Sequence, residues 1–304
     1  HISFGDPETL YKPIEYALSI GGKRVRPVLM LMAHQLFELD IRKSLKAAVG
    51  IEIFHNFTLL HDDIMDQAPI RRGCQTIHEK WNNNTAILSG DTMLVQAYNL
   101  ISSVEDSKIT SVLQVFNKTA KEICEGQRLD MDFETRDNVT IDEYLKMIEY
   151  KTSVLLAASL KIGAINGGAS KEDADHIYEF GKNLGIAFQL KDDLLDIFGD
   201  PDAFGKQIGG DIISNKKTYL YLKALELADS DQYNNLIKYF SINDNNEDKV
   251  QRVKDIYEKL DIFREATDLI DQYNLEAFAK LELVSSDNKE DLLNFSRNLM
   301  IRDN

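Results

Sequence analysis

Apolar residues recur at three- and four-residue spacing along most of the chain, which is the period of an amphipathic helix. Gly21-Gly22 and Gly167-Gly168 are typical of helix ends, and Thr140-Ile141-Asp142-Glu143 fits a capping box at a helix start. Helices are therefore expected over residues 7–20, 44–67, 84–103, 109–126, 140–167 and 170–199, with further amphipathic helix after Leu220. No linker rich in Pro, Gly or Ser interrupts the pattern. It predicts an all-α fold in a single domain, residues 1–304.

An acidic cluster lies near the end of the helix expected at residues 44–67. Asp62 and Asp66 are four positions apart, so they share a helix face with Cβ atoms about 5–6 Å apart, and Asp63 lies beside them. Like charges at this spacing repel each other by a few tenths of a kcal/mol per pair. Mg²⁺ prefers carboxylate and phosphate oxygens as ligands. The cluster fits either a solvated acidic turn or a magnesium site.

The pattern Asp-Asp-x-x-Asp occurs again at Asp192, Asp193 and Asp196, in a second apolar helical context. No structural role needs this duplication, whereas two acidic helix faces can hold a cluster of metal ions between them. Arg71 and Arg72 follow the first cluster, after a proline that ends the helix. Their guanidinium groups have the fork geometry that suits phosphate. The repetition favours a magnesium-dependent diphosphate site.

Composition narrows the classes of partner. A formal net charge of −15 disfavours nucleic acid and anionic membrane surfaces. The longest apolar runs, at residues 28–33 and 154–160, are far shorter than the roughly 18 residues that span a bilayer. Cys74 and Cys124 lack metal-ligand spacing and indicate reduced thiols in a cytoplasmic protein. A diphosphate site in so acidic a protein needs metal ions and a few placed Lys and Arg residues to invert the local charge.

A basic loop, Gly21-Gly22-Lys23-Arg24-Val25-Arg26-Pro27, precedes another expected helix. Proline is favoured in the first helical turn, and a helix amino terminus beside cations is a natural anion site. A solvated basic loop is the alternative interpretation.

Together these motifs resemble those of the trans-isoprenyl diphosphate synthases, the polyprenyl synthetase family. The resemblance covers roughly residues 10–225 and includes, in the family's order, Arg71-Arg72-Gly73, Lys151-Thr152, Gly205-Lys206 and Lys216-Lys217-Thr218. It implies a helical bundle around a central cavity and a prenyltransferase that condenses isopentenyl diphosphate with an allylic diphosphate. It also implies two or three Mg²⁺ ions and a homodimer, with no nucleic-acid partner and no stable membrane insertion.

The resemblance assigns a role to each candidate residue. The metal ligands would be Asp62, Asp66 and Asp192, with Asp63, Asp193 and Asp196 as outer or alternate ligands. Isopentenyl diphosphate would contact Lys23, Arg26, His55 and Arg72. The allylic diphosphate would contact Arg71, Lys151, Thr152, Gln189, Lys206 and Lys216. The residues expected to carry catalysis are Asp62, Asp66, Asp192, Lys151 and Arg71. Arg24 is expected to be structural and Lys217 to face solvent.

The length of the prenyl product must be limited by a side chain that blocks further elongation. Each added isoprene unit buries about five carbons, worth about 3–4 kcal/mol, so burial alone never stops elongation. Phe57, five residues before Asp62, is the candidate wall, helped by Phe54 and Thr58. The alternative is that both aromatics only fill the core, which is their commonest use. An aromatic at this position resembles the short-chain enzymes that make C15 to C20 products, farnesyl and geranylgeranyl diphosphate.

Other reactions fit the motifs less well. A longer-chain synthase shares all of them. A class I terpene cyclase shares the first acidic motif and the helical fold, but it has no second diphosphate to bind and so does not need the basic loop. A di-iron bundle expects Glu-x-x-His pairs on facing helices, and the sequence has none at paired positions.

Overall fold

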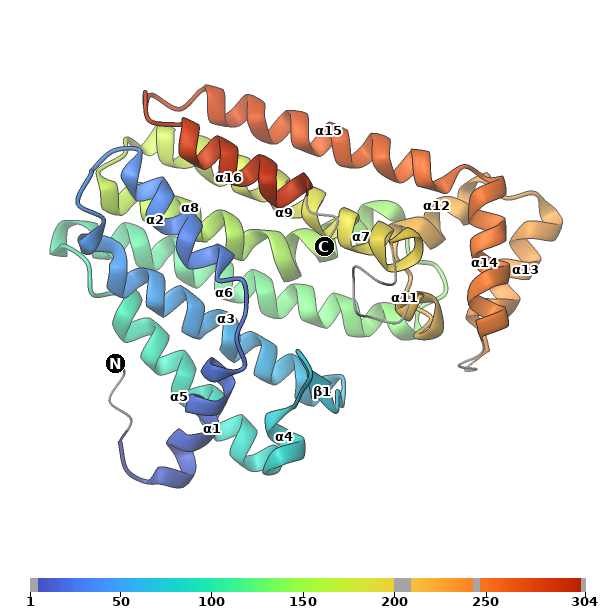
Figure 1. The fold of residues 1–304 in the computed structure, drawn as a ribbon, viewed down its shortest axis with the longest axis horizontal. Coiled ribbons are helices and arrows are strands. Elements are labelled where there is room, and N and C mark those ends of the chain that lie inside the picture. Colours follow the sequence, from blue (N-terminus) through green and yellow to red (C-terminus); the bar gives the residue numbers. More distant parts are fainter. Residues whose placement is uncertain (1–4, 200–208, 243–246, 302–304) are drawn as a thin grey trace. The chain divides into compact units, whose positions relative to one another are not determined.

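The computed structural model describes residues 5–199, 209–242 and 247–301. Within these ranges the chain is almost entirely helical (Figure 1). The strands found there are β1 (Ile70–Arg71) and β2 (Cys74–Gln75), which pair antiparallel. The predicted all-α fold is confirmed. A search of the described helices finds no candidate for a membrane span.

The chain groups into two compact units. The first comprises residues 1–117, 158–175 and 286–288, and the second comprises residues 118–157, 176–285 and 289–304. Three helices contribute residues to both units: α6 (Asp106–Thr135), α8 (Val154–Gly167) and α9 (Lys171–Phe198). The single-domain organisation stays a prediction.

The first unit is built around two long helices that lie side by side, α3 (Leu45–Met65) and α5 (Asn83–Ile101) (Figure 1). A Cβ at Gly50 of α3 would lie 2.8 Å from Cγ1 of Ile101, so the close approach requires glycine. Phe54 and Phe116 pack edge to face at 4.8 Å in the core of this unit. Its other elements are α1 (Glu8–Ser19), α2 (Val25–Gln35), the short η1 (Ile41–Ser44) and α4 (Ile77–Lys80).

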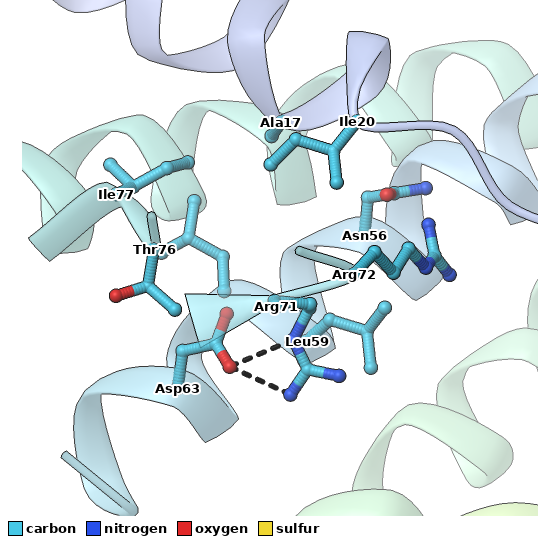
Figure 2. Close-up of a pocket in the computed structure, with 10 residues that line it drawn as sticks. Ala17, Ile20, Asn56, Leu59, Asp63, Arg71, Arg72, Thr76 and Ile77 are labelled. Atoms are coloured by element: carbon cyan, nitrogen blue, oxygen red, sulfur yellow. Dashed lines mark hydrogen bonds and ion pairs between the residues drawn. The ribbon is translucent and has the colours of Figure 1, made fainter. Parts of the chain in front are cut away.

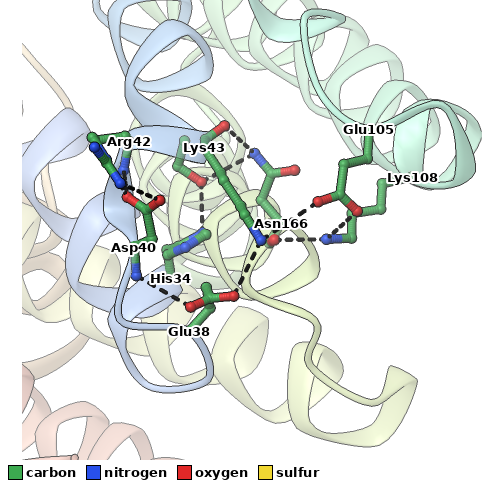
Figure 3. A network of polar contacts seen from close by, with 9 residues as sticks. His34, Glu38, Asp40, Arg42, Lys43, Glu105, Lys108 and Asn166 are labelled. Carbon is green, nitrogen blue, oxygen red and sulfur yellow. Dashed lines mark hydrogen bonds and ion pairs between the residues drawn. The ribbon is translucent and has the colours of Figure 1, made fainter.

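A polar network fixes the junction of α2, η1 and α8 (Figure 3). The buried His34 contacts Ser44 Oγ through Nδ1 at 2.8 Å, and Asn166 Nδ2 donates to the same oxygen at 3.0 Å. Lys108 Nζ donates to the carbonyl of Asn166 at 2.9 Å. Burial lowers the pKa of His34, so its imidazole is neutral at neutral pH. The network therefore depends on an uncharged histidine.

The second unit has one hydrophobic core formed by all of its longer helices. Phe180 of α9 packs against Phe278 of α15 with ring centroids 6.1 Å apart. Its remaining elements are α7 (Ile141–Ile148), η2 (Glu149–Ser153), α11 (Gly210–Ile213), α12 (Tyr219–Leu227), α13 (Ser230–Phe240), α14 (Glu247–Lys259), α15 (Ile262–Glu282) and α16 (Glu290–Ile301).

A π-helical turn, η2, interrupts the helix predicted over residues 140–167. The helix begins as expected, because Thr140 and Glu143 form a reciprocal capping box. Gly126 lies directly against η2: a Cβ there would overlap the backbone nitrogen of Lys151 and lie 2.7 Å from the carbonyl carbon of Tyr150. The expectation that a helix ends at Gly126 is therefore wrong, since α6 continues to Thr135 and its glycine serves close packing.

Candidate active site

The first acidic motif occupies the carboxyl end of α3. Asp62 is half-buried and Asp66, the C-cap residue, is exposed, whereas Asp63 is only 5% exposed. Arg71 reaches Asp63 from β1, with Nε and Nη2 each 2.7 Å from Oδ1 (Figure 2). Burial raises the pKa of the Asp63 carboxyl, and the hydrogen bond from Arg71 opposes that shift. Asp63 thus anchors the hairpin, while Asp66 is exposed to solvent and Asp62 is only partly exposed, with its Oδ1 buried.

Arg71 contacts the first aspartate of this motif as well as the second. Its Nη2 lies 3.4 Å from Oδ2 of Asp62, in addition to its contacts with Asp63. The hairpin turn that presents it has positive φ at Arg72 and Gly73, 52° and 75°. The tight turn sends the two consecutive guanidinium groups in different directions, Arg71 to the end of α3 and Arg72 to the loop at Gly21.

A cationic cluster lies in the first unit, formed by Arg26, Arg72 and His55. Nη1 of Arg26 lies 3.2 Å from Nε2 of His55. Arg72 donates to the carbonyl oxygen of Gly21, and a Cβ at Gly22 would lie 2.7 Å from Arg72 Nη1. The glycine pair therefore lets the arginine pass close to the backbone.

The electrostatics of this cluster are compatible with the predicted anion site. Burial lowers the pKa of Arg26 to about 10, and burial together with the charge of Arg26 lowers the pKa of His55 well below its usual value. Nε of Arg26 is buried and finds no acceptor among the described residues. A phosphate oxygen is an acceptor that suits a guanidinium donor of this kind.

Two neighbours of the cluster differ from it. Arg24 ion-pairs with Glu52 and donates to the carbonyl of Leu18 at 2.8 Å, which fits the structural role expected for it. Lys23 is exposed on the loop before α2, where it is accessible to an incoming anion.

A small cavity lies behind the first motif (Figure 2). Its volume is about 20 Å³, enough for roughly one water molecule. Polar atoms of Asn56, Asp63, Arg71 and Arg72 line it on one side and apolar residues of α1 and α3 on the other. It is too small for a prenyl chain.

The chain-length candidates occupy different layers. Phe54 is 1% exposed and belongs to the core, where it supports Phe57 from behind at 5.6 Å between ring centroids. Phe57 is half-buried and also contacts the ring of His61 at 4.7 Å. Thr58 Oγ1 donates back to the carbonyl of His55 at 2.8 Å. Phe57 is therefore the member of this group best placed to meet a substrate.

The second acidic motif lies on α9 and, like the first, has a buried second aspartate. Asp192 is exposed and Asp193 is 5% exposed. Asp193 accepts a hydrogen bond from Tyr144 Oη through Oδ2 and one from Gln189 Nε2, at 3.1 Å, through Oδ1. Burial raises the pKa of Asp193 well above its usual value, the charge of Asp211 raises it further, and the two hydrogen bonds act in the opposite direction.

Asp196 has a different task. Its Oδ2 accepts a hydrogen bond from the backbone N–H of Asp211 at 3.0 Å, next to the start of the short helix α11. Asp63, Asp193 and Asp196, predicted as outer or alternate metal ligands, are thus each bound to protein donors. Of the six aspartates, Asp66 and Asp192 are exposed.

Lys151 and Thr152 lie within the π-helical turn. Lys151 Nζ is 2.5 Å from Oδ2 of Asp130 on α6, and Thr152 Oγ1 donates to Gln189 Oε1 at 3.3 Å. Asp130 was not singled out from the sequence. Its position follows from the structure, because it lies four residues, about one turn, after Gly126 and so on the helix face that packs against η2.

The lysines after α11 separate into two environments. Lys216 is exposed, with Nζ 3.8 Å from Oδ1 of Asp211. Lys217 was expected to face solvent, which is wrong: its Nζ donates to the carbonyls of Phe133 at 2.8 Å and Glu134 at 3.4 Å, at the carboxyl end of α6. Cations are favoured at helix carboxyl ends. Lys206 lies outside the described residues.

The sequence matches a family model described as polyprenyl synthetase over residues 7–260. This chain belongs to the polyprenyl synthetase family. Among curated members it is 48% identical to geranylgeranyl diphosphate synthase of Methanosarcina mazei over 222 residues, 72% of this chain and 68% of the relative. It is 37% identical to geranylgeranyl diphosphate synthase of Sulfolobus acidocaldarius over 286 residues, 93% of this chain and 86% of the relative.

Solved structures of polyprenyl synthetases match the fold throughout. A crystal structure of geranylgeranyl pyrophosphate synthase superposes with a TM-score of 0.94 at 45% identity, covering 99% of this chain and 94% of that one. The geranylgeranyl pyrophosphate synthetase of Pyrococcus horikoshii gives 0.91 at 34% identity, with 98% and 91% covered. The family resemblance inferred from the motifs is confirmed.

A metal site can be tested against the donors present in this polyprenyl synthetase. No group of three His, Cys, Asp or Glu residues lies at metal-binding distance in the part of the chain that the structure describes. The predicted ligands, Asp62, Asp66 and Asp192, are carboxylates, which are ligands that Mg²⁺ prefers. The donor chemistry of each motif, taken by itself, therefore fits magnesium.

Proposed function

We propose that this polyprenyl synthetase condenses isopentenyl diphosphate with an allylic diphosphate, dimethylallyl, geranyl or farnesyl, and releases pyrophosphate. The family match makes the chain a prenyltransferase. The observation that carries the proposal is the shared layout of the two acidic motifs. Each holds its second aspartate, Asp63 or Asp193, through protein donors and keeps another aspartate exposed, Asp66 in the first motif and Asp192 in the second.

Asp62, Asp66 and Asp192 would hold two or three Mg²⁺ ions. When bound, these ions neutralise the diphosphate and favour its departure as pyrophosphate. A unit-charge pair at 4 Å is worth about 4 kcal/mol at an effective dielectric near 20, so a few such contacts supply a substantial part of the barrier reduction. Arg71, Lys151 and Lys216, together with Lys206, would bind the leaving diphosphate.

The cluster of Arg26, His55 and Arg72, with the exposed Lys23, would bind isopentenyl diphosphate without metal. The C–O bond of the allylic substrate breaks and leaves an allylic cation. The double bond of isopentenyl diphosphate then forms the new C–C bond, and a proton leaves the adjacent carbon. Released pyrophosphate is the proposed proton acceptor. His55 suits the binding role, because its neutral imidazole adds no repulsion to the neighbouring guanidinium groups.

We propose a C15 to C20 product, with Phe57 as the wall that stops elongation. Relatives carry the names geranylgeranyl, geranylfarnesyl and farnesyl diphosphate synthase. The half-buried position of Phe57, supported by the buried Phe54, suits a residue that meets the end of a prenyl tail.

A homodimer is proposed from an exposed apolar face on α5. Leu88 and Val95, two turns apart on one side of the helix, are 59% and 60% exposed, and Ile87 lies beside them at 43%. A second copy of the chain would cover this face, and we expect Leu88→Asp to yield a monomer in sedimentation velocity.

We also propose a cytoplasmic location, because Cys74 and Cys124 are both free thiols.

The function is tested by incubating the protein with Mg²⁺, isopentenyl diphosphate and each allylic primer in turn. We expect pyrophosphate release and prenyl diphosphates of 15 to 20 carbons by mass spectrometry. Folded protein that yields no prenyl product with any primer contradicts the proposal.

A further inference from the structure

The second acidic motif is supported by a chain of hydrogen bonds that the proposed reaction does not yet use. Tyr144, on the short helix α7, donates to Oδ2 of Asp193, and Gln189 donates to Oδ1. Gln189 in turn accepts from Thr152. The chain runs from α7 through Asp193 to the π-helical turn, so it links the residue beside Asp192 to the residue beside Lys151.

Tyr144 is held rigidly in this arrangement. It is 3% exposed, belongs to the core of the second unit, and lies in the first half of a helix whose start is locked by the Thr140–Glu143 capping box. A buried tyrosine hydroxyl needs a hydrogen-bond partner, and Asp193 is that partner. Both oxygens of Asp193 are consequently occupied by protein donors.

The two motifs satisfy their buried aspartates with different donors. Asp63 is bound by the cationic guanidinium of Arg71, whereas Asp193 is bound by a neutral phenol and a neutral amide. Each arrangement uses a donor from another element, Arg71 of β1 for Asp63 and Tyr144 of α7 for Asp193, to hold the second aspartate of the motif in place.

We infer that Tyr144 is a positioning residue for the second acidic motif. Through Asp193 it fixes the position of Asp192, and through Asp193 and Gln189 it fixes the position of Thr152. Asp193 acts as the hub of this support and is not itself a metal ligand. This inference rests on the proposed function, because it assigns Tyr144 to the site at which the allylic diphosphate and its magnesium ions bind.

The substitution Tyr144→Phe separates the two roles open to Asp193. If Asp193 were a metal ligand, removal of a competing hydrogen bond would free Oδ2 and leave magnesium binding unchanged or tighter. If Asp193 is the hub, the same substitution loosens the motif and weakens binding. Loss of a supporting hydrogen bond behind metal ligands typically costs about 10- to 100-fold in affinity or activity.

The experiment titrates inorganic pyrophosphate with Mg²⁺ into wild type and Tyr144→Phe by calorimetry, and measures steady-state kinetics on both. We expect the dissociation constant for magnesium pyrophosphate to rise about tenfold and kcat to fall by a similar factor. The KM for isopentenyl diphosphate should stay within twofold, because its proposed ligands belong to the first unit. Tyr257→Phe is the matched control, since Tyr257 is a buried tyrosine of the same core outside both motifs.

Magnesium pyrophosphate binding by Tyr144→Phe that is tighter than, or equal to, that of wild type overturns the inference. If that variant does not fold, Gln189→Met removes the other donor to Asp193, and unchanged or tighter binding there has the same meaning. Wild type that neither binds magnesium pyrophosphate nor forms prenyl product refutes the proposed function instead. The two failures are therefore distinguishable.

Discussion

Gly126 on α6 lies in direct contact with the backbone of Lys151 in the π-helical turn, with no space for a side chain between them. This contact fixes the backbone position from which the side chain of Lys151, proposed to bind the allylic diphosphate, projects. It also fixes the position of Asp130, one turn further along α6, which ion-pairs with the lysine at 2.5 Å. The geometry of Lys151 is set by a glycine on another helix.

Gly126→Ala is predicted to destabilise the protein. Glycine to alanine inside a helix ordinarily stabilises by about 0.5–1 kcal/mol, but overpacking against backbone costs about 1–3 kcal/mol, so the sign is reversed here. Urea unfolding measures the effect, and the KM for the allylic substrate should rise as Lys151 is displaced. Glu125→Ala, at the exposed neighbouring position, is the control. A more stable Gly126→Ala variant with unchanged kinetics would refute this contact.

Phe57→Ala is predicted to lengthen the product. Removing the ring opens space at the proposed wall, and each extra isoprene unit gains about 3–4 kcal/mol of burial. Mass spectrometry of products made with farnesyl diphosphate as primer measures the change. Phe54→Ala is the comparison: as a core residue it should lose about 3–5 kcal/mol of stability. An unchanged product spectrum for Phe57→Ala rejects it as the stop.

Asp192→Ala is predicted to reduce kcat by about 10²- to 10³-fold, because it removes an accessible carboxylate from the proposed magnesium site. Binding of isopentenyl diphosphate alone should be preserved, since Arg26, His55 and Arg72 form its cluster without metal. Calorimetry and steady-state kinetics measure the two effects separately. Glu179→Ala, another carboxylate on α9 that pairs with Lys182, is the control. Equal loss of turnover and binding would contradict this division of labour.

His34 predicts a loss of stability in mild acid. Burial lowers its pKa in the folded state, so below pH 6.5 the unfolded chain takes up a proton that the folded chain refuses. The stability that the neutral histidine allows is therefore fully present above that pH and declines as the pH falls toward the lowered pKa, by at most about 1.4 kcal/mol per pH unit.

The measurement for His34 is the unfolding midpoint between pH 8 and pH 5. His34→Asn keeps a hydrogen-bonding group near Ser44 and removes the titration, so its stability should fall less steeply with acid than that of wild type. His55 shifts in the same direction in both proteins and cancels in the comparison. Parallel curves for the two proteins would exclude the network as the acid-sensitive element.

The sequence predicted most helices and the two acidic motifs because both depend on local spacing. It did not reveal which aspartate of each motif is buried, since that depends on Arg71 and Tyr144, which approach from other elements. Lys217 was misjudged for the same reason: the carbonyls that it binds lie more than 80 residues away in the chain. Gly126 was interpreted as the end of a helix because glycine is common at helix ends. The sequence does not show that the backbone of another helix packs against it.

A π-helical turn holds one residue more than the α-helical turn that it replaces. Deleting a single residue between Glu149 and Ser153 would restore a regular helix, and everything beyond it on α8 would rotate by about 100° around the axis. The turn can thus be viewed as a one-residue insertion retained in an ordinary helix. The extra residue of this turn, rather than the identity of any one side chain, determines that Lys151 faces Asp130 and Thr152 faces Gln189.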